Sequence, residues 1–166
     1  MRTHAAAVLV VALLPACGGN DSPAAPPTPP PTTLPAVGRY SISVTPNPII
    51  ATPSGDPQFP WSATWRVNIQ DIAGVEGDIN RVATTARNNF GFTFVVSDHN
   101  PNDFIQVIGT NHIARNSTFT YTDGMSSYRA DGNGGQQVTL TVVAEIIDAR
   151  GNHSNISTDV RITGMR

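Results

Sequence analysis

Residues 61–70 read Trp61-Ser-Ala-Thr-Trp-Arg-Val-Asn-Ile-Gln70 and alternate between apolar and polar side chains without a break. Successive side chains of a β-strand point to opposite faces, so the two tryptophans and the aliphatic residues share one face and the polar residues share the other. The stretch therefore predicts a strand with one face in a core and one in water.

The same alternation recurs along the chain, and helical periodicity is essentially absent. In the strand predicted over 90–96 we expect Phe90, Phe92, Phe94 and Val96 to face inward. The other predicted strands are 138–146, a last strand with Val160 and Ile162 inward, and weaker candidates at 40–44, 79–86, 104–108 and 118–121.

Turn residues separate these strands. The segment Asp148-Ala-Arg-Gly-Asn152 suits a type I turn followed by Gly151 in the left-handed region, which closes a hairpin. Thr45-Pro-Asn-Pro48 ends the first strand, because proline cannot donate to a central ladder. Asp131-Gly-Asn-Gly-Gly135 is a flexible entry to the strand at 138. Short strands divided in this way predict an all-β, antiparallel β-sandwich of about seven to eight strands.

Two of these features carry a resemblance. The long strand ending in Asp148-Ala-Arg-Gly-Asn152 with its final partner resembles the last hairpin of immunoglobulin-like and fibronectin type III-like domains of bacterial surface proteins. The tryptophan-bearing early strand followed by Asp71-Ile-Ala-Gly-Val75 is also similar to theirs. The resemblance covers most of residues 39–166 and implies an immunoglobulin-like β-sandwich, although the cysteine pair of antibody domains is missing.

The amino terminus has the features of an export signal. Arg2 precedes ten apolar residues, Ala5 to Leu14, which are too few to span a membrane. Leu14-Pro-Ala-Cys17-Gly-Gly19 resembles the lipobox of bacterial lipoproteins. That resemblance implies a signal peptide over 1–16 and lipid attachment at Cys17. Gly18 is not the aspartate that usually signals inner-membrane retention, which favours the outer membrane. The alternative is an ordinary signal peptide cut elsewhere.

Residues 17–38 contain the lipidated cysteine and a proline-rich segment, with seven prolines between Pro23 and Pro35. Proline fixes φ and removes the amide donor, so we expect a disordered linker rich in polyproline II. At about 3.1 Å per residue it would hold the domain up to roughly 65 Å from the lipid. A proline-rich ligand for an aromatic groove is the alternative.

Composition excludes several functions. All ten basic residues are arginine, so lysine Schiff-base chemistry is absent. The single cysteine allows no internal disulfide and no multi-cysteine metal site. The net charge of -2 and 13% charged residues argue against a nucleic-acid partner.

No segment has a common catalytic or metal-binding pattern. Asp98 to Asp103 places oxygen ligands at positions 1, 3 and 5 of a calcium loop, but position 6 is Asp103 where glycine belongs and position 12 is Gly109 where glutamate belongs. The histidines 99, 112 and 153 lack a zinc spacing, and the only glutamates, Glu76 and Glu145, have no carboxylate partner nearby. We therefore expect no catalytic residues, no metal and no cofactor. An enzyme of unrecognised type, with a His/Asp/Glu set clustered in space, stays an alternative.

These observations predict a membrane-anchored cell-envelope lipoprotein whose sandwich is a structural, protein-interaction or adhesion module. Its expected partners are membrane lipid, through acylated Cys17, and an envelope protein or a glycan. The alternative is a carbohydrate-binding lipoprotein that uses at least two coplanar exposed aromatic side chains on one face or at one loop end. We expect Trp65 and Trp61 to fill the core, with Trp61 at the strand mouth; Phe59, Tyr121 and Tyr128 are further aromatic candidates.

Overall fold

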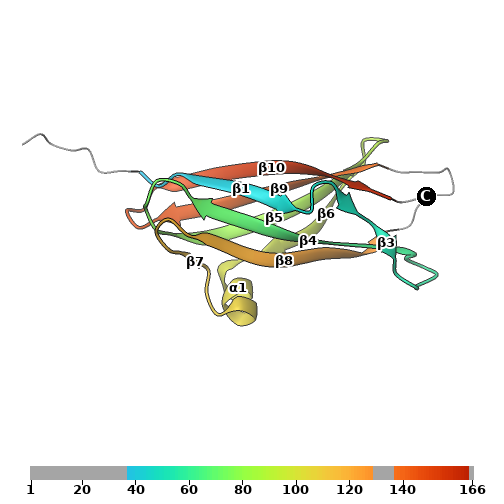
Figure 1. Ribbon diagram of the computed structural model, residues 1–166, viewed down its shortest axis with the longest axis horizontal. Helices are drawn as coiled ribbons and strands as arrows, with labels where there is room; N and C mark the ends of the chain where they lie inside the picture. Colours follow the sequence, from blue (N-terminus) through green and yellow to red (C-terminus); the bar gives the residue numbers. More distant parts are fainter. Residues whose placement is uncertain (1–36, 129–136, 165–166) are drawn as a thin grey trace, which may run out of the picture. The chain divides into compact units, whose positions relative to one another are not determined.

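Two β-sheets packed face to face build the domain, with one short helix beside them (Figure 1). The computed structural model describes residues 37–128 and 137–164, without the side chains of 126–128. The predicted signal peptide, Cys17, nearly all of the linker and the Asp131–Gly135 turn lie outside these residues.

The first sheet is centred on β4 (Trp61–Asp71), the strand that contains the alternating tryptophan segment. β8 (Thr118–Tyr128) pairs with one edge of β4, while β1 (Tyr40–Thr45) and β3 (Thr52–Pro53) share the other. All of these pairs are antiparallel. β8 is an edge strand because β4 is its only partner in the described chain.

The second sheet has the order β2-β10-β9-β5-β6, with β7 also paired to β5. Its strands are β2 (Ile49–Ile50), β5 (Gly77–Asn88), β6 (Thr93–His99), β7 (His112–Ile113), β9 (Val138–Asp148) and β10 (His153–Thr163). Only the short β2–β10 pair is parallel. Consecutive strands β4 and β5 lie in different sheets, as do β8 and β9, which gives the immunoglobulin-like sandwich that the sequence predicted.

The core lies between the two sheets and is built from the alternating positions. Trp65 is 1% exposed, and Val67 and Ile69 are fully buried beside it. The inward residues of β9 and β10 were also predicted correctly, and the following are buried: Val138, Leu140, Val142, Ala144, Ile146, Val160 and Ile162. Trp61 is only partly buried and packs against this core.

The β9–β10 turn was also predicted correctly, because Gly151 has a φ of 81°. Asp148 stabilises this turn through its carboxylate, which accepts the backbone N–H groups of Arg150 and Asn152, both at 2.9 Å. It also accepts the N–H of Gly38 at 2.9 Å, where the chain enters the sandwich. The start of the domain is thereby tied to the β9–β10 turn.

The strand predicted over 104–108 is wrong, because these residues belong to the helix α1 (Pro101–Ile108). The Asn100 side chain accepts the N–H of Asn102 at 2.9 Å, and the Asp103 carboxylate accepts the N–H of Asn100 at 2.8 Å. This reciprocal cap begins a helix, and Gly109 ends it with a φ of 90°. Residues 104–108 are too few for the spacing of their apolar side chains to distinguish a helix from a strand.

The inward assignment of Phe90 and Phe92 is also wrong. Both lie in the turn between β5 and β6 and are 64% and 71% exposed. Phe94 stands opposite the buried Ala86, but the edge of the sheet leaves it 38% exposed. Val96 alone of the four packs against the core, partly buried.

Candidate functional site

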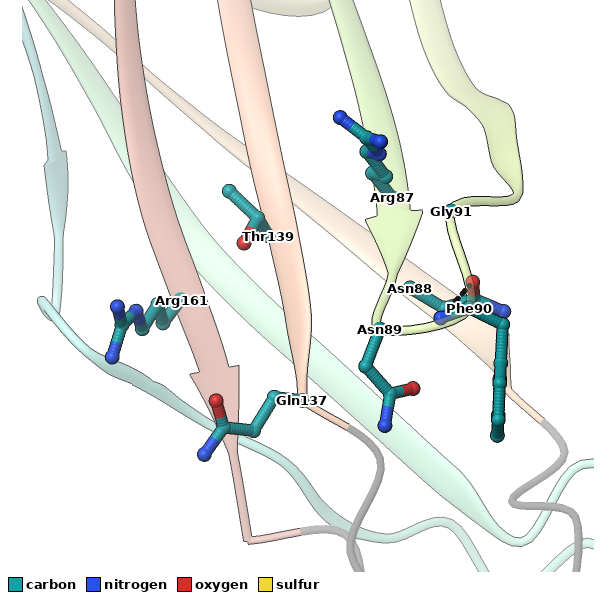
Figure 2. Close-up of a pocket in the computed structure, with 8 residues that line it drawn as sticks. All are labelled: Arg87, Asn88, Asn89, Phe90, Gly91, Gln137, Thr139 and Arg161. Atoms are coloured by element: carbon teal, nitrogen blue, oxygen red, sulfur yellow. Dashed lines mark hydrogen bonds between the residues drawn. The ribbon is translucent and has the colours of Figure 1, made fainter.

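A polar hollow of about 510 Å³ lies at the end of the second sheet where β5 turns into β6 (Figure 2). We call it the arginine hollow. Its lining residues are Arg87, Asn88, Asn89, Phe90, Gly91, Gln137, Thr139 and Arg161.

Strand register brings its two arginines to one face. Arg87 of β5 is opposite Thr139 of β9, and Thr139 is opposite Arg161 of β10. The neighbouring residues Ala86, Val138 and Ile162 are buried, so the alternation directs the arginine row outward. Adjacent strands lie about 4.8 Å apart, which places the two arginine backbones roughly 10 Å apart on either side of Thr139. Figure 2 shows this order across the three strands.

The β5–β6 turn holds an aromatic ring at the rim of the hollow. The Asn88 side chain accepts the N–H groups of Phe90 at 3.1 Å and Phe92 at 3.0 Å. Gly91 has a φ of 88°, which a residue with a side chain rarely adopts. The backbone is therefore fixed locally, and the phenylalanine rings stand in solvent.

The two arginines of the hollow lack a carboxylate partner within the described residues. The acid nearest along β10 is Asp159, one row away, and it accepts the Thr141 hydroxyl at 2.7 Å. Farther along the same face, Arg81 forms a bidentate pair with Asp98 at 2.8 Å. Hydrogen bonding in that pair raises the pKa of Arg81 and lowers the pKa of Asp98. Among the described residues, the arginine charge is thus paired at one end of this face and unpaired at the hollow.

A second hollow, of about 430 Å³, lies between α1 and β8. Phe104 anchors the helix there through ring contacts with Phe119 at 5.5 Å, Tyr121 at 5.2 Å and His99 at 5.6 Å. The His99 Nε2 lies 3.6 Å from an Asp123 oxygen. Burial raises the pKa of Tyr121, so its hydroxyl stays protonated. This cluster joins β6 of one sheet to β8 of the other and has a structural role in packing.

The calcium-like segment uses its carboxylates elsewhere. Asp98 pairs with Arg81, and Asp103 caps the helix. His112 contacts Asp78 at 2.8 Å, while Glu145 and Glu76 each lie near a different arginine. Across residues 37–128 and 137–164, no three His, Cys, Asp or Glu side chains gather as metal ligands would.

Most of the aromatic side chains that the sequence offered as candidates for carbohydrate contact lie in the core or pack against it. Trp65 and Tyr121 are buried, Phe59 is 40% exposed in the loop before β4, and the Tyr128 side chain lies outside the description. The rings that reach solvent at one loop end are instead Phe90 and Phe92. The turn residues Asn88-Asn89 and Gly91 were the signal that could have placed them there.

No protein-family model matches the chain, and no curated protein matches it. Solved structures do match. A protein described as ApaA from Bordetella pertussis is 14% identical, with a TM-score of 0.54 over 75% of this chain and 92% of that one. The structural-genomics target SoR45 is also 14% identical, with a TM-score of 0.51 over 75% and 85% of the two chains. At these identities the likeness shows the fold alone. The CARDB domain of PF1109 from Pyrococcus furiosus matches with a TM-score of 0.42 at 7% identity, over 78% of this chain and 99% of that one.

The described residues contain no helix long and apolar enough to cross a bilayer.

Proposed function

We propose that this chain is a lipid-anchored cell-envelope protein whose sandwich is a protein-interaction or adhesion module without catalytic activity. In this proposal Cys17 is acylated, residues 17–38 form the tether, and the outer membrane is the favoured location. The β-sandwich fold agrees with a structural or interaction role. The hairpin end, defined as the β5–β6 turn with the arginine hollow, is the contact surface.

The placement of the hairpin end carries this proposal. The chain enters at Gly38, whose N–H binds Asp148 beside the β9–β10 turn. β5 runs from Gly77, opposite Asp148, to Asn88, opposite Val138. Its 12 residues separate the two ends of the sheet by roughly 40 Å. The hollow therefore lies at the end of the sandwich opposite the chain entry (Figure 1).

The chemistry of this end also suits a contact surface. Phe90 and Phe92 are the two most exposed aromatic side chains in the described chain, and Phe90 lines the hollow together with two arginines that have no ion pair among the described residues. Aromatic residues and arginine are enriched at protein interfaces and dominate their binding energy. Because these groups contribute nothing to the core, their exposure is explained by a partner.

Site-specific photo-crosslinking in cells tests this proposal. We expect a photoreactive residue at position 92 of the full chain to give a discrete crosslinked product. The matched control is position 149, an exposed alanine in the β9–β10 turn at the other end of the sandwich. Equal labelling at both positions, or none at position 92, would contradict the proposal.

Carbohydrate binding is the second candidate function. It requires two coplanar exposed aromatic side chains on one face or at one loop end, and Phe90 and Phe92 are two exposed rings in one turn. Both candidates use the hairpin end and differ in the partner. A crosslink from position 92 to a single protein favours the first candidate, and a crosslink to a polysaccharide favours the second.

A further inference from the structure

We infer that the arginine hollow binds an acidic saccharide, meaning a sugar chain that carries carboxylate, sulfate or phosphate groups. The inference rests on the proposed function only in taking the hairpin end as the contact surface. It names the chemical class of the ligand and the residues that would recognise it.

The arginine hollow contains two cationic side chains. Arg87 and Arg161 lie on either side of Thr139, roughly 10 Å apart at the backbone. Arginine binds carboxylate, sulfate and phosphate through paired N–H donors, so each can hold one anionic group. The described lining contains no carboxylate, and the nearest one on β10 is Asp159 in the next row, where one of its oxygens accepts the Thr141 hydroxyl. Two separated cations suit a ligand with charges repeated along a chain.

The remaining polar residues suit hydroxyl groups. Asn89 and Gln137 offer amide groups, which both donate and accept, and Thr139 offers a hydroxyl between the arginines. A sugar hydroxyl needs partners of this mixed kind, whereas an isolated inorganic anion uses donors only. The lining therefore fits a polyhydroxylated ligand better than a small anion.

Phe90 supplies the one aromatic surface in the lining. Its ring is 64% exposed at the rim, and the turn holds its backbone in place. The apolar face of a sugar ring packs on such an aromatic face. Phe92, in the same turn, is 71% exposed but is not part of the lining.

Two other anionic partners are less suited to this position. A phosphatidyl headgroup presents a single anionic phosphate, whereas the hollow has two arginines roughly 10 Å apart at the backbone. Nucleic acid requires a broad basic surface, and the whole chain has a net charge of -2. In this acidic protein the lining of the hollow contains two arginines, which favours a sparsely charged sugar chain over a polyanion of high charge density.

Binding of the full chain carrying Cys17→Ser to polygalacturonate and to dextran sulfate tests this inference, with neutral dextran as the uncharged probe. We expect binding to a charged probe and none to neutral dextran. Arg87→Gln and Arg161→Gln should each weaken binding about tenfold or more, because each removes a charge-assisted contact. Arg66→Gln makes the same charge change on the exposed face of β4 and should leave the affinity within twofold. Phe90→Ala should weaken binding about two- to tenfold, whereas Ile72→Ala, which truncates an exposed apolar side chain beside the chain entry, should leave the affinity unchanged.

Several results would overturn the inference. One is an equal loss in Arg66→Gln, which would indicate attraction by net charge. Others are equal binding to neutral dextran, no binding to either charged probe, and arginine-dependent binding to phosphatidylglycerol vesicles that matches or exceeds saccharide binding. If a specific crosslink from position 92 persists in any of these cases, the proposed contact surface stands and only the ligand class is wrong. Unchanged thermal unfolding of the variants verifies that each is folded.

Discussion

At the scale of single residues, the Asp148 carboxylate joins the chain entry at Gly38 to the β9–β10 turn. Its carboxylate accepts bonds from the Asn152 side chain, from Gly38 and from the turn backbone, and it is 4% exposed. These donors, led by the Asn152 side chain, lower its pKa. Burial and the charge of Asp148 raise the pKa of Tyr40 to about 12, so the Tyr40 hydroxyl stays protonated and donates to the Val75 carbonyl at 3.0 Å.

Asp148 should make folding stability dependent on acid. A carboxylate whose pKa is depressed in the folded state stabilises the protein fully above its unfolded pKa, about 3.9, and loses that contribution as the pH falls toward the folded value. We expect Asp148→Asn to lower the melting temperature by several degrees at pH 7. The difference from the wild type should shrink steadily below about pH 4.

Thermal unfolding of wild type and variant between pH 7 and pH 2 measures this effect. Asp56→Asn is the control, because that exposed carboxylate accepts a single backbone N–H from within its own loop. A difference between Asp148→Asn and wild type that stays constant down to pH 2 would count against the assigned role.

At the scale of elements, α1 depends on its cap as well as on the packing of Phe104. The helix has eight residues, and Phe104 is the one it buries. Helices this short are marginal in water without tertiary support. Val107, at 84% exposed, contributes little to that support.

Asn100→Ala should therefore loosen α1 without unfolding the sandwich. Loss of an N-cap costs about 1 kcal/mol, which corresponds to roughly fivefold faster hydrogen exchange at the α1 amides. Exchange in β5 and β9 should not change. The control is Asn102→Ala, which replaces an exposed residue within the first turn. Equal acceleration in the control, or acceleration across the sheets, would show that the cap is not the determinant.

The elements that the sequence predicted correctly are those with one buried face. β4 and β9 each have strands on both sides and one face in the core, so their apolar side chains alternate over the full length. The predicted strand over 90–96 failed because its alternation runs through a turn, and local turn chemistry at Asn88 and Gly91 overrides it. The segment 104–108 failed because a cap formed by Asn100 and Asp103 outweighs a five-residue apolar pattern.

The arginine hollow could not be predicted from the sequence alone. Arg87 and Arg161 are 74 positions apart, and only the register of β5, β9 and β10 brings them beside Thr139. A pairing shift of one residue would turn each arginine toward the core. The individual strands are visible in a single sequence, but their order and register are not.

At the scale of the whole molecule, the acidic net charge bears on the anchor. A chain of net charge -2 gains nothing from anionic lipids, so the proposed attachment to a membrane relies on the acyl chains of Cys17. We expect radioactive palmitate to label the wild-type chain in a bacterial host and to place it in the membrane fraction. Cys17→Ser should abolish the label and release the protein from that fraction.

Label on the serine variant, or its absence from the wild type, would remove the lipid anchor from the proposal. Neither result would alter the sandwich or the hairpin end. The comparison is direct because Cys17 is the one cysteine in the sequence.

The opposite placement of the chain entry and the hairpin end has a mechanical consequence. If the anchor pulls at Gly38 while a partner holds the β5–β6 turn, the tension runs along the strands. β1 is antiparallel to β4 over six register pairs, from Tyr40 opposite Asp71 to Thr45 opposite Arg66. Force in this direction shears all of these pairs together, whereas a perpendicular force would unzip them one after another. Under such a load, the first strand would be pulled along its own axis, so a domain anchored and bound in this way would resist extension.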